Sequence, residues 1–172
     1  MRLSKLGAFC AATAIAATGL ALPLAQSAGA ALKASVVCSK IAATTTLNTA
    51  AGTGTTSTNW LTCTPSALSA GGSSKVTVPI SKLTGNLTSK ITWKNSKGTT
   101  TVTMKYTTQK TKTGCPSGTA YRTIITGTTK ASTGAAKNIV KVGEPINAEV
   151  CTKTASSTKY VSTLKPGTKF KI

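Results

Sequence analysis

The stretch at residues 91–106, ITWKNSKGTTTVTMKY, decides the fold class. Ile91 and Trp93 before its centre, and Val102 and Met104 after it, alternate with threonine and lysine. Alternation with a period of two is typical of a strand that has one buried face. The centre, NSKG, has the composition of a turn. The stretch therefore predicts a β-hairpin with one apolar face and one face of threonine and lysine.

The register of this hairpin follows from the position of its turn. With the turn at residues 95–98, the numbers of opposed residues sum to 193 (95 + 98). The apolar face then pairs Leu87 with Tyr106, Ser89 with Met104, Ile91 with Val102, and Trp93 with Thr100. All eight residues fall on one face, as a pleated pair requires. We expect this four-residue turn because a three-residue loop with a glycine bulge would break the match on one strand.

The rest of the chain also reads as strands, since no window shows a helical period of apolar residues. Threonine, a strand former, supplies 33 of residues 31–172. Residues 42–57 are predicted to be a long loop. In KVTVPI, Val76 and Val78 should face inward, and Pro79 suits a sheet edge or a bulge. The predicted strands are residues 34–41, 58–63, 75–80, 87–94, 100–107, 120–127, 137–142, 146–151, 159–164 and 168–172.

Short strands at regular spacing, with glycine, proline and serine between them, are typical of two all-β architectures. The sequence therefore predicts an antiparallel β-sandwich or barrel of about eight to ten strands.

Residues 1–30 are predicted to be a secretory signal peptide, and residues 31–172 a single β-sandwich-like domain. Arg2 and Lys5 precede an almost wholly apolar run at residues 6–24, and small residues follow at a cleavage position. The alternative is an uncleaved membrane anchor, since the run is near the minimum length that spans a bilayer. Its many alanines, glycines and threonines make it weakly hydrophobic and favour the signal peptide. We therefore expect a secreted protein, extracellular or at the cell surface.

Four cysteines follow residue 30, and an even number in an exported chain is typical of disulfides. They are Cys38, Cys63, Cys115 and Cys151, which allow three pairings. We favour Cys38 with Cys63 and Cys115 with Cys151, because each bridge would then join neighbouring strands across a short loop. A zinc site is disfavoured, since the chain has no CxxC spacing and no histidine.

The positive charge is the most unusual feature of the composition. Without Arg2 and Lys5, 19 of the 21 basic residues remain against Glu144 and Glu149, for a net charge of +17. Internal ion pairs cannot neutralise this excess, so most lysines must lie in solvent. Outward lysines also protect strand edges from intermolecular pairing, which is the alternative explanation. The candidate anion-binding residues on the predicted hairpin are Lys90, Lys94, Lys97 and Lys105.

Residues suited to catalysis are scarce. The chain has no histidine or aspartate, and the paired cysteines leave no nucleophilic triad and few general bases. Glu144 and Glu149 would lie on the order of 16 Å apart on an extended strand, too far for paired catalytic carboxylates. Clustered carboxylates and a phosphate-binding glycine loop are also missing. We therefore expect no enzyme activity, no cofactor, no metal site and no small-molecule substrate.

Anionic polymers are the partners that the charge favours. Lysines alone give salt-sensitive affinity for phosphate. Specific nucleic-acid binding is not expected, because residues 31–172 contain one arginine, Arg122, and few aromatic residues to stack on bases. The expected partners are anionic wall polymers, sulfated or phosphorylated glycans, or an acidic membrane surface.

Several segments together carry a resemblance. They are the alanine-rich export segment, ASVVCSK at residues 34–40, the hairpin at residues 91–106, GCPSGTAYRTIITGTT at residues 114–129, and a closing cysteine strand. In combination they resemble uncharacterised secreted β-rich proteins of high-GC Gram-positive bacteria. The resemblance implies an extracellular β-sandwich and carries no catalytic or ligand-binding residues. This chain has more lysine and fewer acids than the resemblance implies.

The sequence therefore predicts a secreted, non-catalytic structural or interaction protein whose lysine and threonine face binds anionic cell-envelope polymers or glycans. The alternative is a membrane-active cationic protein of antimicrobial or toxin-like type. Such a protein should expose apolar anchors beside its lysines, whereas strand alternation separates the two here.

Overall fold

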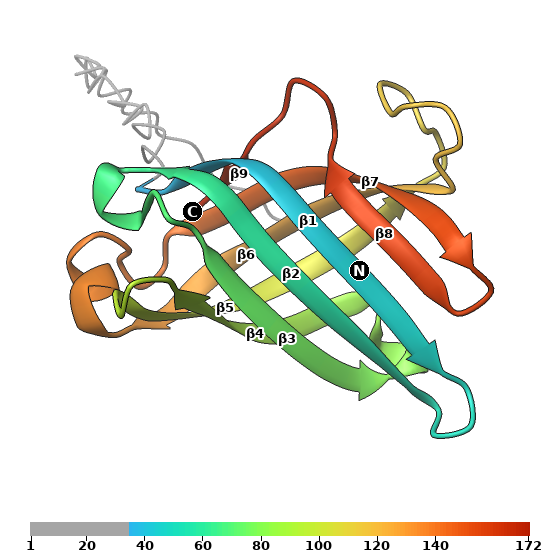
Figure 1. Ribbon diagram of the computed structural model, residues 1–172, viewed down its shortest axis with the longest axis horizontal. Coiled ribbons are helices and arrows are strands. Elements are labelled where there is room, and N and C mark those ends of the chain that lie inside the picture. Colours follow the sequence, from blue (N-terminus) through green and yellow to red (C-terminus); the bar gives the residue numbers. More distant parts are fainter. Residues whose placement is uncertain (1–34) are drawn as a thin grey trace, which may run out of the picture. The chain divides into compact units, whose positions relative to one another are not determined.

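The computed structural model describes residues 35–172, which form one antiparallel sheet (Figure 1). The predicted export segment, residues 1–30, lies outside the described residues. No helix in the described part of the chain is long and apolar enough to cross a membrane. Three short 3-10 helices in this part are η1 Ser66–Leu68, η2 Ile80–Lys82 and η3 Gly134–Asn138. The strands are β1 Val37–Asn48, β2 Thr53–Thr64, β3 Gly72–Pro79, β4 Gly85–Trp93, β5 Gly98–Gln109, β6 Tyr121–Ser132, β7 Pro145–Ser156, β8 Lys159–Leu164 and β9 Phe170–Lys171.

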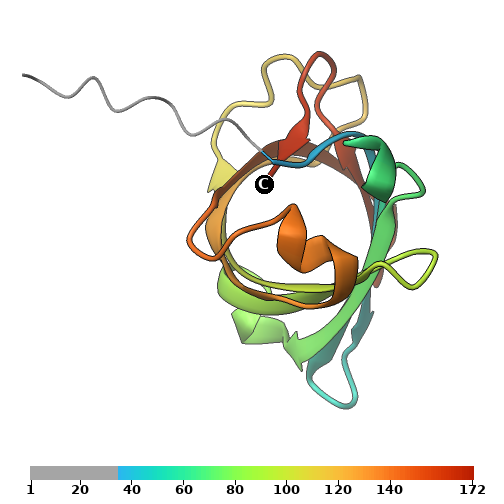
Figure 2. The ribbon, with the colours of Figure 1, turned by 90° about the vertical axis from the view of Figure 1, so that its left-hand side faces the viewer.

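Eight of these strands close into an up-and-down barrel (Figure 2). Each of them pairs with the next along the chain, and β8 pairs back with β1. The short β9 adds pairs to β1 and β7. Of the two predicted architectures the barrel is correct, and the expected sandwich-like domain is wrong. The reason is that β1 bonds to β2 on one edge and to β8 on the other, so the strands do not divide into two stacked sheets.

The predicted faces of the hairpin are confirmed. Ile91, Trp93, Val102 and Met104 are buried inside the barrel, whereas Lys90 is exposed on its outer surface. The same alternation holds in β3, where Val76 and Val78 are half-buried and Lys75 and Thr77 are exposed. Residue parity in β3, β4 and β5 therefore separates the apolar side chains of the core from the lysines of the outer surface.

The predicted register of this hairpin is wrong by two residues. Trp93 opposes Gly98 rather than Thr100, so opposed numbers sum to 191 and the turn is residues 94–97. The cause lies at Gly98, which has a φ of +95°, and where a Cβ would lie 2.0 Å from the carbonyl oxygen of Thr133. This close approach to the segment after β6 makes Gly98 the first residue of β5. A shift of two keeps every side chain on its predicted face.

Residues 42–57, predicted to be a loop, instead form most of the β1–β2 hairpin. Only residues 49–52 lie between the two strands. Threonine occupies inward as well as outward positions here, so the sequence shows no alternation of apolar and polar residues. Facing threonines bond across the strands instead, as Thr45 and Thr56 do with their Oγ1 atoms 2.9 Å apart.

One end of the barrel is closed by η3, which crosses it in Figure 2. Residues 137–142, predicted to be a strand, belong to this closure as the end of η3 and the turn after it. Their apolar residues suit a strand, but Val140 packs into the barrel end instead. Val36 and Ile172 meet here through two backbone hydrogen bonds of 2.9 Å. The fully buried side chains at this end include Val36, Leu68, Trp93, Ala136, Phe170 and Ile172.

Both favoured disulfides are present. Cys38 and Cys63 oppose each other on β1 and β2 with their Cα atoms 3.9 Å apart, so this bridge joins neighbouring strands as expected. The second bridge departs from that expectation, because Cys115 lies in the β5–β6 connection and fastens this loop to Cys151 of β7. Two disulfides indicate that the protein folds in an oxidising environment.

Candidate functional site

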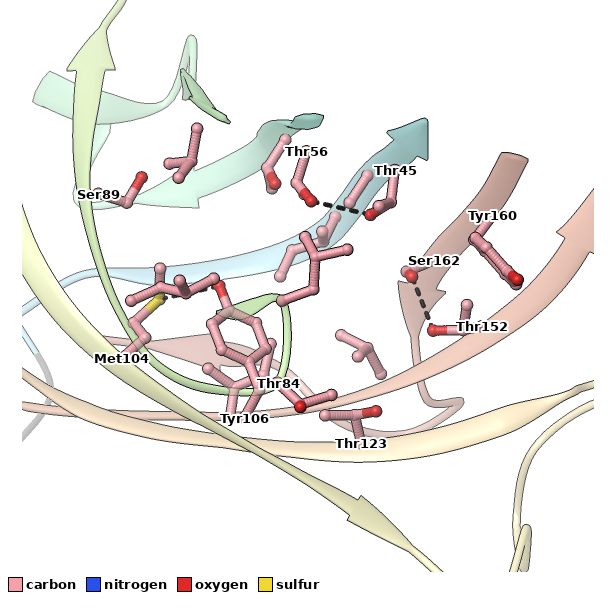
Figure 3. A pocket seen from close by; sticks show the side chains of 18 of the residues that line it. Thr45, Thr56, Thr84, Ser89, Met104, Tyr106, Thr123, Thr152, Tyr160 and Ser162 are labelled. Carbon is pink, nitrogen blue, oxygen red and sulfur yellow. Dashed lines mark hydrogen bonds between the residues drawn. The ribbon is translucent and has the colours of Figure 1, made fainter. Parts of the chain in front are cut away.

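The half of the barrel away from η3 contains a cavity of about 360 Å³ (Figure 3). All eight barrel strands contribute to its wall, together with η2 and β9. The inner part of the wall is apolar and buried: Ile41, Trp60, Met104, Ile125, Val150 and Phe170. Toward the end opposite η3, called here the open end, the wall includes Thr45, Thr56, Tyr106, Thr123, Thr152 and Ser162.

The cavity follows from the sizes of the inward side chains. An eight-stranded barrel is just wide enough for its inward side chains to fill it. Large residues such as Trp93 and Phe170 do so near η3. Nearer the open end, the inward positions of β1 and β2 carry Ala43, Thr45 and Thr58. These small side chains leave the interior unfilled.

Two pairs of hydroxyl groups in the wall bond to each other. The Oγ1 atom of Thr152 lies 2.7 Å from Ser162 Oγ, and Thr45 bonds to Thr56 in the same way (dashed lines in Figure 3). Paired hydroxyls add little polarity to the wall. Two other wall groups, Trp60 Nε1 and Ser89 Oγ, are buried and have no hydrogen-bond partner among residues 35–172.

The wall is uncharged. None of the described residues that line the cavity is a lysine, arginine, aspartate or glutamate. The hydroxyl of Tyr106 donates to Met104 Sδ at 3.8 Å, and burial raises the pKa of Tyr106 to about 12, so this phenol is neutral at physiological pH. An ionised ligand would lose its hydration here without meeting an opposite charge, which is costly. The cavity therefore favours an uncharged molecule.

Apolar side chains surround the open end. The rings of Tyr121 on β6 and Tyr160 on β8 have centroids 6.4 Å apart, and Tyr121 is 48% exposed. On the β3 side, η2 and the residue after it contribute Ile80 and Leu83. Leu83 packs so closely over Gly54 that a Cβ at residue 54 would lie 2.6 Å from its Cδ1 atom. An apolar molecule would thus meet an apolar entrance.

The predicted anion-binding lysines do not converge on one point. Lys90 and Lys105 lie on the outer faces of β4 and β5, and each opposes an uncharged residue in the hairpin. Lys94 and Lys97 belong to the turn between the two strands. The four side chains are therefore spread along the hairpin from one end of the barrel toward the other.

Lys90 instead meets Lys75 of β3 at a groove on the outer surface of the barrel. The volume of this outer groove is about 500 Å³. It lies where β3 and β4 separate, after pairing through only two residue pairs. Apart from the two lysines, its lining is hydroxyl or amide in character: Ser57, Thr58, Asn59, Ser73, Ser74 and Thr92.

The two glutamates are engaged in separate contacts. Glu149, on the outer face of β7, accepts hydrogen bonds from Lys165 Nζ at 3.0 Å and Arg122 Nη2 at 2.8 Å. The bonds from Lys165 and Arg122 hold the pKa of Glu149 below its usual value. Glu144 accepts a bond of 2.5 Å from the hydroxyl of Ser35. Among the described residues, no group of three histidine, cysteine, aspartate or glutamate side chains is placed to hold a metal ion.

No protein-family model, curated protein or solved structure matches this chain. Its function is therefore inferred from the geometry of residues 35–172. The cavity is a feature that the sequence does not predict. The inward small residues Ala43, Thr45 and Thr56 are the signal for it, but they fall in the segment that is predicted to be a loop.

Proposed function

We propose that this protein is a secreted, non-catalytic binding protein that holds a small, uncharged and mainly apolar molecule in the barrel cavity. The cavity itself carries the proposal: about 360 Å³, in the half of the barrel away from η3, with no charged side chain among the described residues of its wall. Small-molecule sites typically have volumes of about 300 to 1,000 Å³. Some eight-stranded barrels hold one small ligand in their interior.

Secretion is part of this proposal. The two disulfides persist in oxidising compartments, and residues 1–30 have the pattern of an export signal. The lysine and threonine outer surface keeps the barrel separate from other copies through charge repulsion. A binding protein with this surface can carry an apolar molecule through the medium or retain it near the cell.

Binding of N-phenyl-1-naphthylamine, a neutral apolar fluorophore, tests the proposal. We expect saturable binding at one site per chain, with quenching of Trp60 because this residue lines the cavity. The substitution Thr123→Phe puts an aromatic ring into the cavity from β6. It should weaken binding by about 10-fold or more, since a loss of about 1.4 kcal/mol in contacts suffices for this.

The matched control is Thr126→Phe, which adds the same ring on the exposed outer face of the same strand. This variant should bind the fluorophore as the wild type does. If the wild type shows no saturable binding, or if Thr123→Phe binds as tightly as Thr126→Phe, the cavity is not the site and the proposal is wrong.

A further inference from the structure

The hydrogen-bonding pattern between β3 and β4 shows which backbone groups face the outer groove. Lys94 donates its backbone N–H to the carbonyl of Gly71 at 3.0 Å, which makes these residues a hydrogen-bonded pair of the β3–β4 ladder. Such pairs recur at every second residue of an antiparallel ladder. The next pair is Ser73 with Thr92, which the structure contains.

Lys75 and Lys90 would form the following pair of this ladder, but β3 and β4 have already separated there. The backbone N–H groups of both residues therefore point toward the gap between the strands and not toward β2 or β5. Their ammonium groups extend from the same two residues over the outer surface. Two backbone donors and two cationic side chains are thus directed at one groove.

The surroundings of the groove favour an anion. Its remaining lining supplies hydroxyl groups and one amide, and neither Glu144 nor Glu149 lies in it. Glu149 lies on β7 and contacts Arg122 and Lys165, and Glu144 lies in the connection before β7 and contacts Ser35. Lys75 and Lys90 therefore repel each other with no nearby carboxylate among the described lining residues, and an anion between them would relieve the repulsion.

We infer that the outer groove binds the sulfate or phosphate groups of an anionic polymer, with Lys75 and Lys90 as its main contacts. Ammonium and backbone N–H groups are the donors that bind such oxygens through charge-assisted hydrogen bonds. The inference does not depend on the cavity, because Lys75 and Lys90 line the groove and not the cavity, with which the groove shares only Thr58 and Ser74. The sequence predicts anion binding by the lysine and threonine face, and this inference places that binding at the outer groove.

Two short oligomers serve as probes: a heparin-derived tetrasaccharide for sulfate and a tetramer of glycerol phosphate for phosphate. Short probes cannot reach from the groove to distant lysines. The double variant Lys75→Gln and Lys90→Gln should lower affinity about 10-fold at 50 mM salt, because it removes two exposed ion pairs with the oligomer. It should also reduce the slope of log affinity against log salt by about two.

The control is the double variant Lys94→Gln and Lys105→Gln, which removes the same charge from the hairpin outside the groove. It should bind within about twofold of the wild type. Equal losses in both double variants would show that the charge acts diffusely and would overturn the inference. Binding of only one oligomer, with the same dependence on Lys75 and Lys90, supports the inference and identifies sulfate or phosphate as the preferred group.

Backbone amide resonances and vesicle leakage provide two further tests of the groove. In the wild type, the backbone amide resonances of residues 75 and 90 should shift when an oligomer is added, and those of residues 94 and 105 should not. Leakage of anionic vesicles without binding of either oligomer overturns the inference and favours the membrane-active alternative.

Discussion

Ser89 and Thr100 are both buried hydroxyl-bearing residues of the β4–β5 hairpin, but their hydrogen bonding differs. Thr100 Oγ1 accepts from Trp93 Nε1 at 2.8 Å and lies 3.2 Å from Ser132 Oγ. Ser89 Oγ has no partner among residues 35–172. Removing these two hydroxyls should therefore change the free energy of unfolding in opposite directions.

The magnitudes follow from the cost of burying an unpaired polar group, which is about 1 to 3 kcal/mol. Ser89→Ala removes such a group and should stabilise the protein by about 1 kcal/mol. Thr100→Val keeps the shape of the side chain but leaves the indole N–H of Trp93 unpaired in the core. This variant should lose about 1 to 3 kcal/mol.

Urea unfolding without reductant measures both effects, with tryptophan fluorescence as the signal. With a slope of about 2 kcal/mol per molar urea, the midpoint should rise by about 0.5 M for Ser89→Ala and fall by about 0.5 to 1.5 M for Thr100→Val. The slopes should stay equal, since neither change alters the buried area greatly. A lower midpoint for Ser89→Ala would refute the reasoning, because it would mean that the hydroxyl makes a stabilising hydrogen bond.

Further predictions concern the second disulfide and the carboxylate on β7. Replacing Cys115 and Cys151 by serine opens a loop with a sequence separation of 36 and should cost about 3.8 kcal/mol on the chain-entropy relation; a loss below about 1 kcal/mol in urea unfolding would contradict this. The pKa of Glu149 is lowered by Lys165 and Arg122, so its stabilising effect is present above the ordinary value of 4.5 and lost as pH falls through the lower folded value. Thermal unfolding between about pH 5 and pH 2 should therefore show a smaller loss of stability for Glu149→Gln than for the wild type; parallel curves would disprove the linkage.

The faces of the strands were predictable because parity depends only on local alternation. Trp93 and Val102 are buried and Lys90 is exposed, whatever the register. The register itself was not predictable, since it depends on the contact between Gly98 of β5 and Thr133, which follows β6. A contact of this kind leaves no trace in the hairpin sequence alone.

Closure of the sheet was not predictable for a similar reason. A sandwich and a barrel share short alternating strands, and they differ in which strand pairs with β1. The pairing of β1 could not be predicted because the β1–β2 hairpin is rich in threonine. Thr45 and Thr56 form a hydrogen bond with each other inside the barrel, where apolar residues are usual. The cavity went unpredicted with it, whereas the cysteine pairing was predicted correctly from short spacing.

Among the candidate lysines, Lys90 lies at the outer groove and its partner there, Lys75, was not selected from the sequence. The two are neighbours because β4 follows β3 in the sheet and then separates from it. Charge counting finds an excess of lysine but does not show which lysines lie together. Strand pairing supplies that information.

The backbone pairing of Val36 with Ile172 joins two residues that are synthesised far apart in time. During synthesis β1 is made before the other strands, yet its partners β8 and β9 follow more than a hundred residues later. Contacts of such high sequence separation make folding slow. The outer edge of β1 must therefore stay unpaired until β8 and β9 have been made. Protection of that edge until β8 is available would decide how much protein reaches the closed barrel.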